Sequence, residues 1–214
     1  MDLSYTEEQE LFRKSVRDFV QGRVTPERLA EAADGDGWDP GLWKEAVGLG
    51  IAGVSVPEEH GGAGLGIIEE SIVAEELGRG LFPGPWLGSV VMAQPALSRR
   101  PDLLSAVASG DRIATLVGLD EPAIEGEPFQ YVVDLDAADL LVVRTIEGWY
   151  ALDKNRAVEW RVLPTVDGTR RLGEVTVGPR DGELLAGGDQ AFAIAEQTRV
   201  RAMAALASEA VGVA

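Results

Sequence analysis

The residues best suited to shape a ligand site lie in a glycine-rich stretch, residues 50–66. Its sequence is G-I-A-G-V-S-V-P-E-E-H-G-G-A-G-L-G, in which a short apolar piece ends at Pro57 and a loop follows. Glycine permits positive φ and close approach of the backbone. The loop is therefore either a tight packing corner between helices or a wall against which a flat ligand lies. Loops often carry function, but packing is the commoner role, and His60 in this loop has the same two interpretations.

A cluster of glutamates follows in residues 67–77, where the apolar spacing predicts a helix. The polar side of that helix would carry Glu69, Glu70, Glu75 and Glu76. Paired carboxylates are able to bind a metal ion or to transfer protons. A solvated face, or buried acids that bind neighbouring arginines, is the more common arrangement, and we favour it here.

Composition excludes several classes of function. The chain has 36 acidic and 19 basic residues, a net charge of −17, which argues against binding to nucleic acid or to an anionic membrane. It has no cysteine and one histidine, so disulfides, thiolate sites and multi-histidine metal sites are excluded. The first residues are acidic rather than typical of a signal peptide, and no apolar run reaches membrane-spanning length. We therefore expect a cytoplasmic protein without a bound metal.

The elements that would position these residues change in character at residue 110. Before it, helices are predicted at about 7–20, 26–33, 41–49, 67–77, 87–97 and 101–109, the first opened by the capping box Thr6-Glu7-Glu8-Gln9. After it, strands are predicted at 113–119, 130–135, 139–145, 149–152, 158–163 and 173–177. The predicted fold class is α+β: an N-terminal helical bundle (1–110), a small antiparallel β-barrel (111–187) and the first helix of a C-terminal bundle (188–214).

The last predicted helix is unusually apolar. Its sequence from residue 205 is A-L-A-S-E-A-V-G-V-A, small and apolar on most sides. An apolar stripe is predicted along Ala193, Val200, Met203, Ala207, Ala210 and Ala214. A helix of this kind requires neighbours on both sides. Either the sequence is part of a longer chain, or another subunit covers the helix.

Three segments together resemble the acyl-CoA dehydrogenase family of flavoproteins. They are S-Y-T-E-E-Q-E-L-F-R-K-S-V-R-D-F-V at 4–20, L-W-K-E-A-V-G-L-G-I-A-G-V-S-V-P-E-E-H-G-G-A-G-L-G at 42–66, and E-E-L-G-R at 75–79. The β-segment is similar more loosely, through L-D-E-P at 119–122 and A-A-D-L-L-V-V at 137–143. The resemblance covers nearly all of this chain but only the earlier part of a typical member.

The resemblance implies a chemistry and a cofactor. In the family, a glutamate removes the proton alpha to an acyl-CoA thioester while hydride passes from the beta carbon to FAD, which carries the redox chemistry. That glutamate belongs to the C-terminal helical domain, so we assign no catalytic residue in this chain. The implied partners are an acyl-CoA substrate, an electron-transfer protein, and a second acyl-CoA dehydrogenase-like subunit in a homo- or hetero-oligomer.

The same resemblance assigns binding residues, with departures from the family pattern. Leu119 and Asp120 fall at the flavin edge, where the family has Thr or Ser in place of Asp120 and a carboxylate would face an electron-rich reduced flavin. Tyr131 and Val133 match the Trp-x-Thr/Ser beside the flavin, although Val133 has no hydroxyl and Tyr131 is as easily a core residue. The substrate side would be His60, Gly61 and Gly62. Two arginines further along, Arg170 and Arg171, are candidates for CoA phosphates or are exposed strand-end residues.

Two functions remain open from the sequence. The first is a flavoprotein that dehydrogenates an acyl-CoA thioester with FAD, within an oligomer that supplies the missing parts. The second is a structural partner subunit of a hetero-oligomeric acyl-CoA dehydrogenase whose own flavin site has decayed. Flavin bound only in the presence of a partner would indicate the second.

Overall fold

The computed structural model describes residues 4–178 and 182–214, and its first half is helical. The helices are α1 (Glu7–Arg23), α2 (Pro26–Asp34), α3 (Pro40–Gly48), α4 (Ile67–Arg79), α5 (Gln94–Leu97) and α6 (Pro101–Ala108). Two 3₁₀ turns, η1 (Ile51–Gly53) and η2 (Glu58–His60), lie between α3 and α4. The segment η3 (Leu87–Ala93) is a π-helix that runs directly into α5, where the sequence predicted one continuous helix.

Local sequence explains where these helices begin. Thr6 and Gln9 form the expected capping box: the Gln9 amide donates to the Thr6 hydroxyl at 3.2 Å, and the Thr6 amide donates to the Gln9 side chain at 3.0 Å. Proline occupies the first position of α2 and α3, where its missing N–H has no helical acceptor to lose. Asp39 caps α3 by accepting the Leu42 amide at 2.9 Å.

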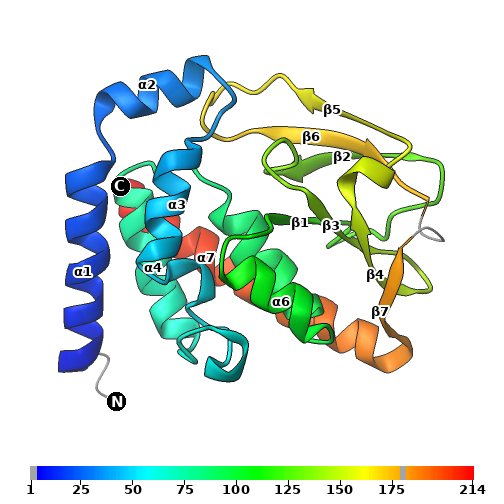
Figure 1. Cartoon of the computed structure of the whole chain (residues 1–214), viewed down its shortest axis with the longest axis horizontal. Coiled ribbons are helices and arrows are strands. Elements are labelled where there is room, and N and C mark those ends of the chain that lie inside the picture. Colours follow the sequence, from blue (N-terminus) through cyan, green and yellow to red (C-terminus); the bar gives the residue numbers. More distant parts are fainter. Residues whose placement is uncertain (1–3, 179–181) are drawn as a thin grey trace.

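The second half contains seven strands among the described residues. They are β1 (Ala114–Val117), β2 (Pro128–Val133), β3 (Leu140–Arg144), β4 (Gly148–Asp153), β5 (Glu159–Leu163), β6 (Leu172–Thr176) and β7 (Glu183–Gly187), with a 3₁₀ turn η4 (Lys154–Arg156) after β4. They form a four-stranded sheet in the order β1-β3-β4-β7 and a three-stranded sheet in the order β2-β6-β5. A cluster of buried residues, including Val117, Leu135, Leu141 and Val175, packs between the two sheets (Figure 1).

The α+β class and the order of its parts are confirmed, and three details of the β region differ from the prediction. The strands form two packed sheets rather than one hydrogen-bonded barrel. The β1–β3 pair is parallel, because the intervening β2 belongs to the other sheet. The strand β7 was not predicted, since its five residues pass into the following helix without a turn.

The last helix, α7 (Gly188–Val213), connects the two halves of the molecule. Figure 1 shows it running from below β7 to the side of α4. Ile194 and Ala195 pack with the sheet and the α5–α6 region, whereas Ala202 and Ala205 pack in the helical core. The cluster that contains Ile194 and Ala195 combines residues from both sides of the domain boundary predicted between residues 110 and 111. The two parts therefore share a hydrophobic core.

The apolar stripe expected on α7 lies on its open side. Val200 is 57% exposed and Met203 is 64% exposed, and the alanines of the stripe are exposed as well. The helix instead packs inward through smaller residues: Ala195, Thr198, Ala202, Ala205 and Gly212, together with Ile194. Small residues face inward because α4 approaches closely, so the bulkier apolar side chains are left on the outside.

Candidate functional site

A cavity of about 1210 Å³ lies between the β region, the helical region and α7. All four residues expected to bind the cofactor, Leu119, Asp120, Tyr131 and Val133, line it. Leu119 and Asp120 lie in the loop after β1, and Tyr131 and Val133 lie on β2. Leu206 and Ala210 of α7 line the same cavity. The structure therefore brings these four residues together at one cavity, and their binding role remains a prediction.

The residues expected on the substrate side do not reach this cavity. His60, Gly61 and Gly62 lie at and just after η2 and are not among the residues that line it. A Cβ on Gly62 would collide with Val56, and one on Gly53 would lie 3.2 Å from the Gly62 Cα atom. The glycine-rich stretch thus folds as the packing corner, the more common of its two interpretations. The assignment of His60, Gly61 and Gly62 gains no support from their position.

The cavity has an apolar floor and an acidic mouth. Phe82, Leu87 and Leu116 on its floor are 8%, 7% and 3% exposed. Four of the described acidic residues line the cavity. Asp120, Glu121 and Asp167 are exposed, and Glu209 of α7 is partly buried. Arg170 provides the single cationic side chain among the described lining residues.

Tyr131 stands at this mouth rather than in the core. It is 68% exposed and has a φ of +63°, a conformation that residues other than glycine rarely adopt. The β2–β6 register shifts between Phe129 and Val132, so the chain bulges here. Bulges of this kind redirect side chains. The core alternative for Tyr131 is therefore wrong.

Arg170 is held by an acidic residue of α7 that the sequence did not indicate as its partner. Its guanidinium forms an ion pair with Glu209 of α7. Asp134, which is 9% exposed and follows the lining residue Val133, accepts the Gly88 amide of η3 at 3.1 Å. Burial raises the pKa of Asp134 to about 7, although the charge of Arg170 and the Gly88 amide act in the opposite direction. The neighbouring Arg171 points elsewhere and donates to the Gly35 carbonyl.

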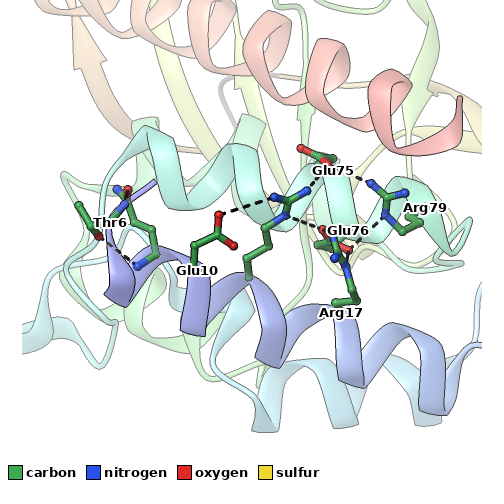
Figure 2. Close-up of polar contacts among 8 residues, drawn as sticks. Thr6, Glu10, Arg17, Glu75, Glu76 and Arg79 are labelled. Atoms are coloured by element: carbon green, nitrogen blue, oxygen red, sulfur yellow. Dashed lines mark hydrogen bonds and ion pairs between the residues drawn. The ribbon is translucent and has the colours of Figure 1, made fainter. Parts of the chain in front are cut away.

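The four glutamates of α4 bind other parts of the protein, chiefly arginines, as the sequence suggested. Glu76 is fully buried and accepts from Arg17 Nε at 2.9 Å and from Arg13 Nε at 3.0 Å. Arg79 lies 3.4 Å from the same carboxylate, and Glu75 accepts from Arg13 and Arg79 at 3.0 Å each. Figure 2 shows this network between α1 and α4. A fully paired buried carboxylate of this kind has a structural role.

The remaining two acids of α4 are also paired. Glu70 is 2% exposed and binds Arg201 of α7, whose Nε lies 3.1 Å from Oε2. Ser55 joins the pair by accepting from the Arg201 guanidinium at 2.9 Å. Glu69 accepts the Gln9 side chain at 2.9 Å. No group of three or more potential metal ligands occurs in residues 4–178 and 182–214.

The architecture defines a class of protein: a helical domain packed on a small β domain, with a long helix that spans both and a cavity between them. Residues 6–99 match the family model described as acyl-CoA dehydrogenase, N-terminal domain. Acyl-CoA dehydrogenase IpdE2 of Mycolicibacterium smegmatis is 33% identical over 181 residues, which cover 81% of this chain and 53% of that protein. IpdE2 of Mycobacterium tuberculosis is 34% identical and is covered to 50%.

Solved structures agree with the fold. The ChsE4–ChsE5 complex from Mycobacterium tuberculosis superposes with a TM-score of 0.80 at 24% identity, covering 94% of this chain and 64% of that one. Butyryl-CoA dehydrogenase from Megasphaera elsdenii gives a TM-score of 0.77 at 17% identity, with coverage of 99% and 67%. Residues 6–99 thus belong to the acyl-CoA dehydrogenase family as its N-terminal domain, and the chain spans about half the length of the curated relatives it matches. Within the described part of the chain, no helix is long and apolar enough to cross a membrane.

The family implies FAD, and the cavity permits a test of the fit. A flavin dinucleotide carries a diphosphate, which proteins usually bind with arginines or with the amides at a helix N-terminus. The cavity offers one arginine, already paired with Glu209, against four carboxylates. If Asp120 lies at the flavin edge, as the resemblance implies, its carboxylate would face a ring that becomes electron-rich on reduction, and Val133 would provide no hydroxyl. The residues that this chain contributes do not fit the cofactor.

Proposed function

We propose that this chain is a partner subunit of an acyl-CoA dehydrogenase assembly and that the flavin is held by the other subunit. The acidic mouth of the cavity supports this proposal, because Asp120, Glu121, Asp167 and Glu209 line the same cavity as the residues expected to bind FAD, which is an anionic dinucleotide. Coulomb repulsion between such groups is large wherever water is partly excluded. The reaction of the assembly would be the α,β-dehydrogenation of an acyl-CoA thioester. The substrate and an electron-transfer protein remain expectations from the family.

The exposed face of α7 supports an association with another subunit. Phe192, Val200, Met203 and Val211 are between 57% and 67% exposed on this one helix and do not line the cavity. Apolar side chains gathered on one face typically mark a protein–protein contact. The ChsE4–ChsE5 structure, which shares the fold, is a complex of ChsE4 with ChsE5. We therefore place the partner against α7.

A second candidate is a chain that itself binds FAD in an oligomer. One observation favours it: Leu119, Asp120, Tyr131 and Val133 line one cavity. In that case the partner would have to supply cations that offset the carboxylates.

Flavin absorbance distinguishes the two candidates. The chain is purified alone and after co-expression with a full-length acyl-CoA dehydrogenase homologue from the same genome, and absorbance is recorded at about 450 nm, the ordinary flavin band. We expect a colourless chain and a yellow complex. A yellow chain without a partner would overturn the proposal. A homologue that never co-purifies with the chain would also contradict it.

A further inference from the structure

The charge and polarity of the side chains that line the cavity indicate which class of ligand it would bind in place of flavin. We infer that the cavity binds a largely apolar small molecule that carries no phosphate or other anionic group. This inference rests on the proposed function in one respect: the space is not taken by FAD bound to this chain. It goes further by assigning a ligand class to the space.

Charge is the first argument. Four carboxylates and one guanidinium line the cavity, and that guanidinium is already paired with Glu209. An anionic ligand would have to displace Glu209 from Arg170 and leave that carboxylate unpaired. Removing one member of such a pair is costly, so anions are disfavoured.

The floor provides the second argument. Phe82, Leu87 and Leu116 form a buried apolar surface there, and Met92 and Phe129 extend it. None of these side chains has a hydrogen-bond donor for a polar ligand. Their only acceptor is the methionine sulfur, which is a weak one. A hydrocarbon placed here gains about 25 cal/mol for each Å² of apolar surface removed from water.

The mouth provides the third argument, because two large side chains from different elements line the cavity and are exposed. Tyr131 of β2 is 68% exposed, and Leu206 of α7 is 48% exposed. A ligand that fills the cavity would cover both. The volume of about 1210 Å³ is sufficient for a drug-sized molecule, whose sites usually measure about 300–1,000 Å³.

A matched pair of fluorescent probes tests the inference on the isolated chain. N-phenyl-1-naphthylamine is uncharged, and 1-anilinonaphthalene-8-sulfonate has the same ring system with one added sulfonate. We expect the neutral probe to bind at least about tenfold more tightly, a difference of about 1.4 kcal/mol. The double substitution Asp120→Asn and Glu121→Gln should reduce this preference. Equal affinity for the two probes, or tighter binding of the sulfonate, would overturn the inference.

Two variants of α7 locate the binding site. Leu206→Glu places a carboxylate on the cavity wall and should weaken the neutral probe by about tenfold or more. Met203→Glu is the matched control: Met203 is 64% exposed on the same helix and does not line the cavity, so binding should not change. Both positions are exposed, and circular dichroism checks that both variants fold. Equal effects of the two substitutions would show that the probe binds elsewhere.

Titration with FAD separates this inference from the proposed function. If the isolated chain binds FAD with a Kd below about 10 µM, a standard free energy near −7 kcal/mol, the proposed function and the ligand inference both fail. If a flavin-containing complex forms with a partner while the isolated chain binds neither probe, only the ligand inference fails.

Discussion

Gly212 of α7 lies directly against Glu75 of α4, where a Cβ on the glycine would collide with the Glu75 carbonyl oxygen. The same is true in the reverse direction, since a Cβ on Gly78 of α4 would collide with Glu209 of α7. Nearer the N-terminal ends of both helices, Arg201 of α7 binds Glu70 of α4. The contacts therefore follow the same order along both helices, which run alongside each other in the same direction. The cavity wall formed by α7 thus depends on two glycines and one ion pair.

Substitution of Gly212 should separate these helices. Gly212→Ala inserts a methyl group into backbone, and we expect the free energy of unfolding to fall by about 2 kcal/mol or more. Gly22→Ala in α1 is the control, because nothing lies within 4 Å of its added Cβ, and helical alanine is favoured over glycine by about 0.5–1 kcal/mol. Urea denaturation measures both. Equal, small effects would mean that the helices do not approach this closely.

The network around Glu76 should dominate the electrostatic contribution to stability. Glu76→Gln leaves Arg13, Arg17 and Arg79 without their shared carboxylate, and we expect a loss of about 3–5 kcal/mol. Asp18→Asn is the control: it removes the exposed Lys14–Asp18 pair and should cost less than about 1 kcal/mol. A Glu76 variant as stable as the Asp18 variant would contradict the role assigned to the network.

The same network predicts loss of stability in acid. Burial would raise the pKa of Glu76, but the hydrogen bonds from Arg17 and Arg13 outweigh it, and the pKa is lowered in the folded state. The stabilisation is therefore present above the ordinary glutamate pKa and is lost as pH falls through the folded value. Thermal unfolding from pH 6 to pH 3 should show this loss, and Glu76→Gln should reduce it. An unchanged acid profile in the variant would assign the loss to other groups.

The sequence was sufficient to predict the helical region and most of the strands, because capping residues and apolar periodicity are local signals. Thr6, Pro26 and Pro40 open helices where expected. Strand partners were not predictable in this way. The parallel β1–β3 pair forms because β2 belongs to the other sheet. That arrangement is decided by tertiary packing rather than by local sequence.

The candidate site was predictable in part. Leu119, Asp120, Tyr131 and Val133 were found by resemblance, and they do line one cavity. Glu209 and Leu206 were missed, because their helix approaches the site through tertiary packing and no local motif marks them. The orientation of α7 was not predictable either: its bulkiest apolar residues face outward, since the contact with α4 admits only small ones.

Asp134 should make the protein less stable as pH rises toward neutrality. Its pKa is raised from 3.8 to about 7 in the folded state, so the folded form retains a proton that the unfolded chain releases. The groups that face it are Arg170, Asp136, Glu209 and the Gly88 amide. Stability that is fully present below pH 3.8 is then lost as pH rises to about 7, by up to about 4 kcal/mol.

Asp134→Asn tests this relationship. Asparagine still accepts the Gly88 amide and tolerates the φ of +56° at this position. Denaturation between pH 4.5 and pH 8 should show a decline for the wild type that is absent or smaller in the variant. Asp36→Asn, an exposed acid in the loop after α2, is the control and should leave the decline unchanged. Parallel curves for the wild type and the Asp134 variant would contradict the prediction.

Association with a partner should depend on the open face of α7. Val200 and Met203 are large, apolar and more than half exposed there, and carboxylates at an interface core are strongly disfavoured. We expect the double substitution Val200→Glu and Met203→Glu to abolish co-purification with an acyl-CoA dehydrogenase homologue, and with it the flavin absorbance. The matched control is Leu11→Glu on α1, which is 67% exposed on a different helix and should leave the complex intact. If the α7 variant still co-purifies while the α1 variant does not, the partner binds the opposite side of the molecule, and the cavity wall formed by α7 faces solvent in the assembly.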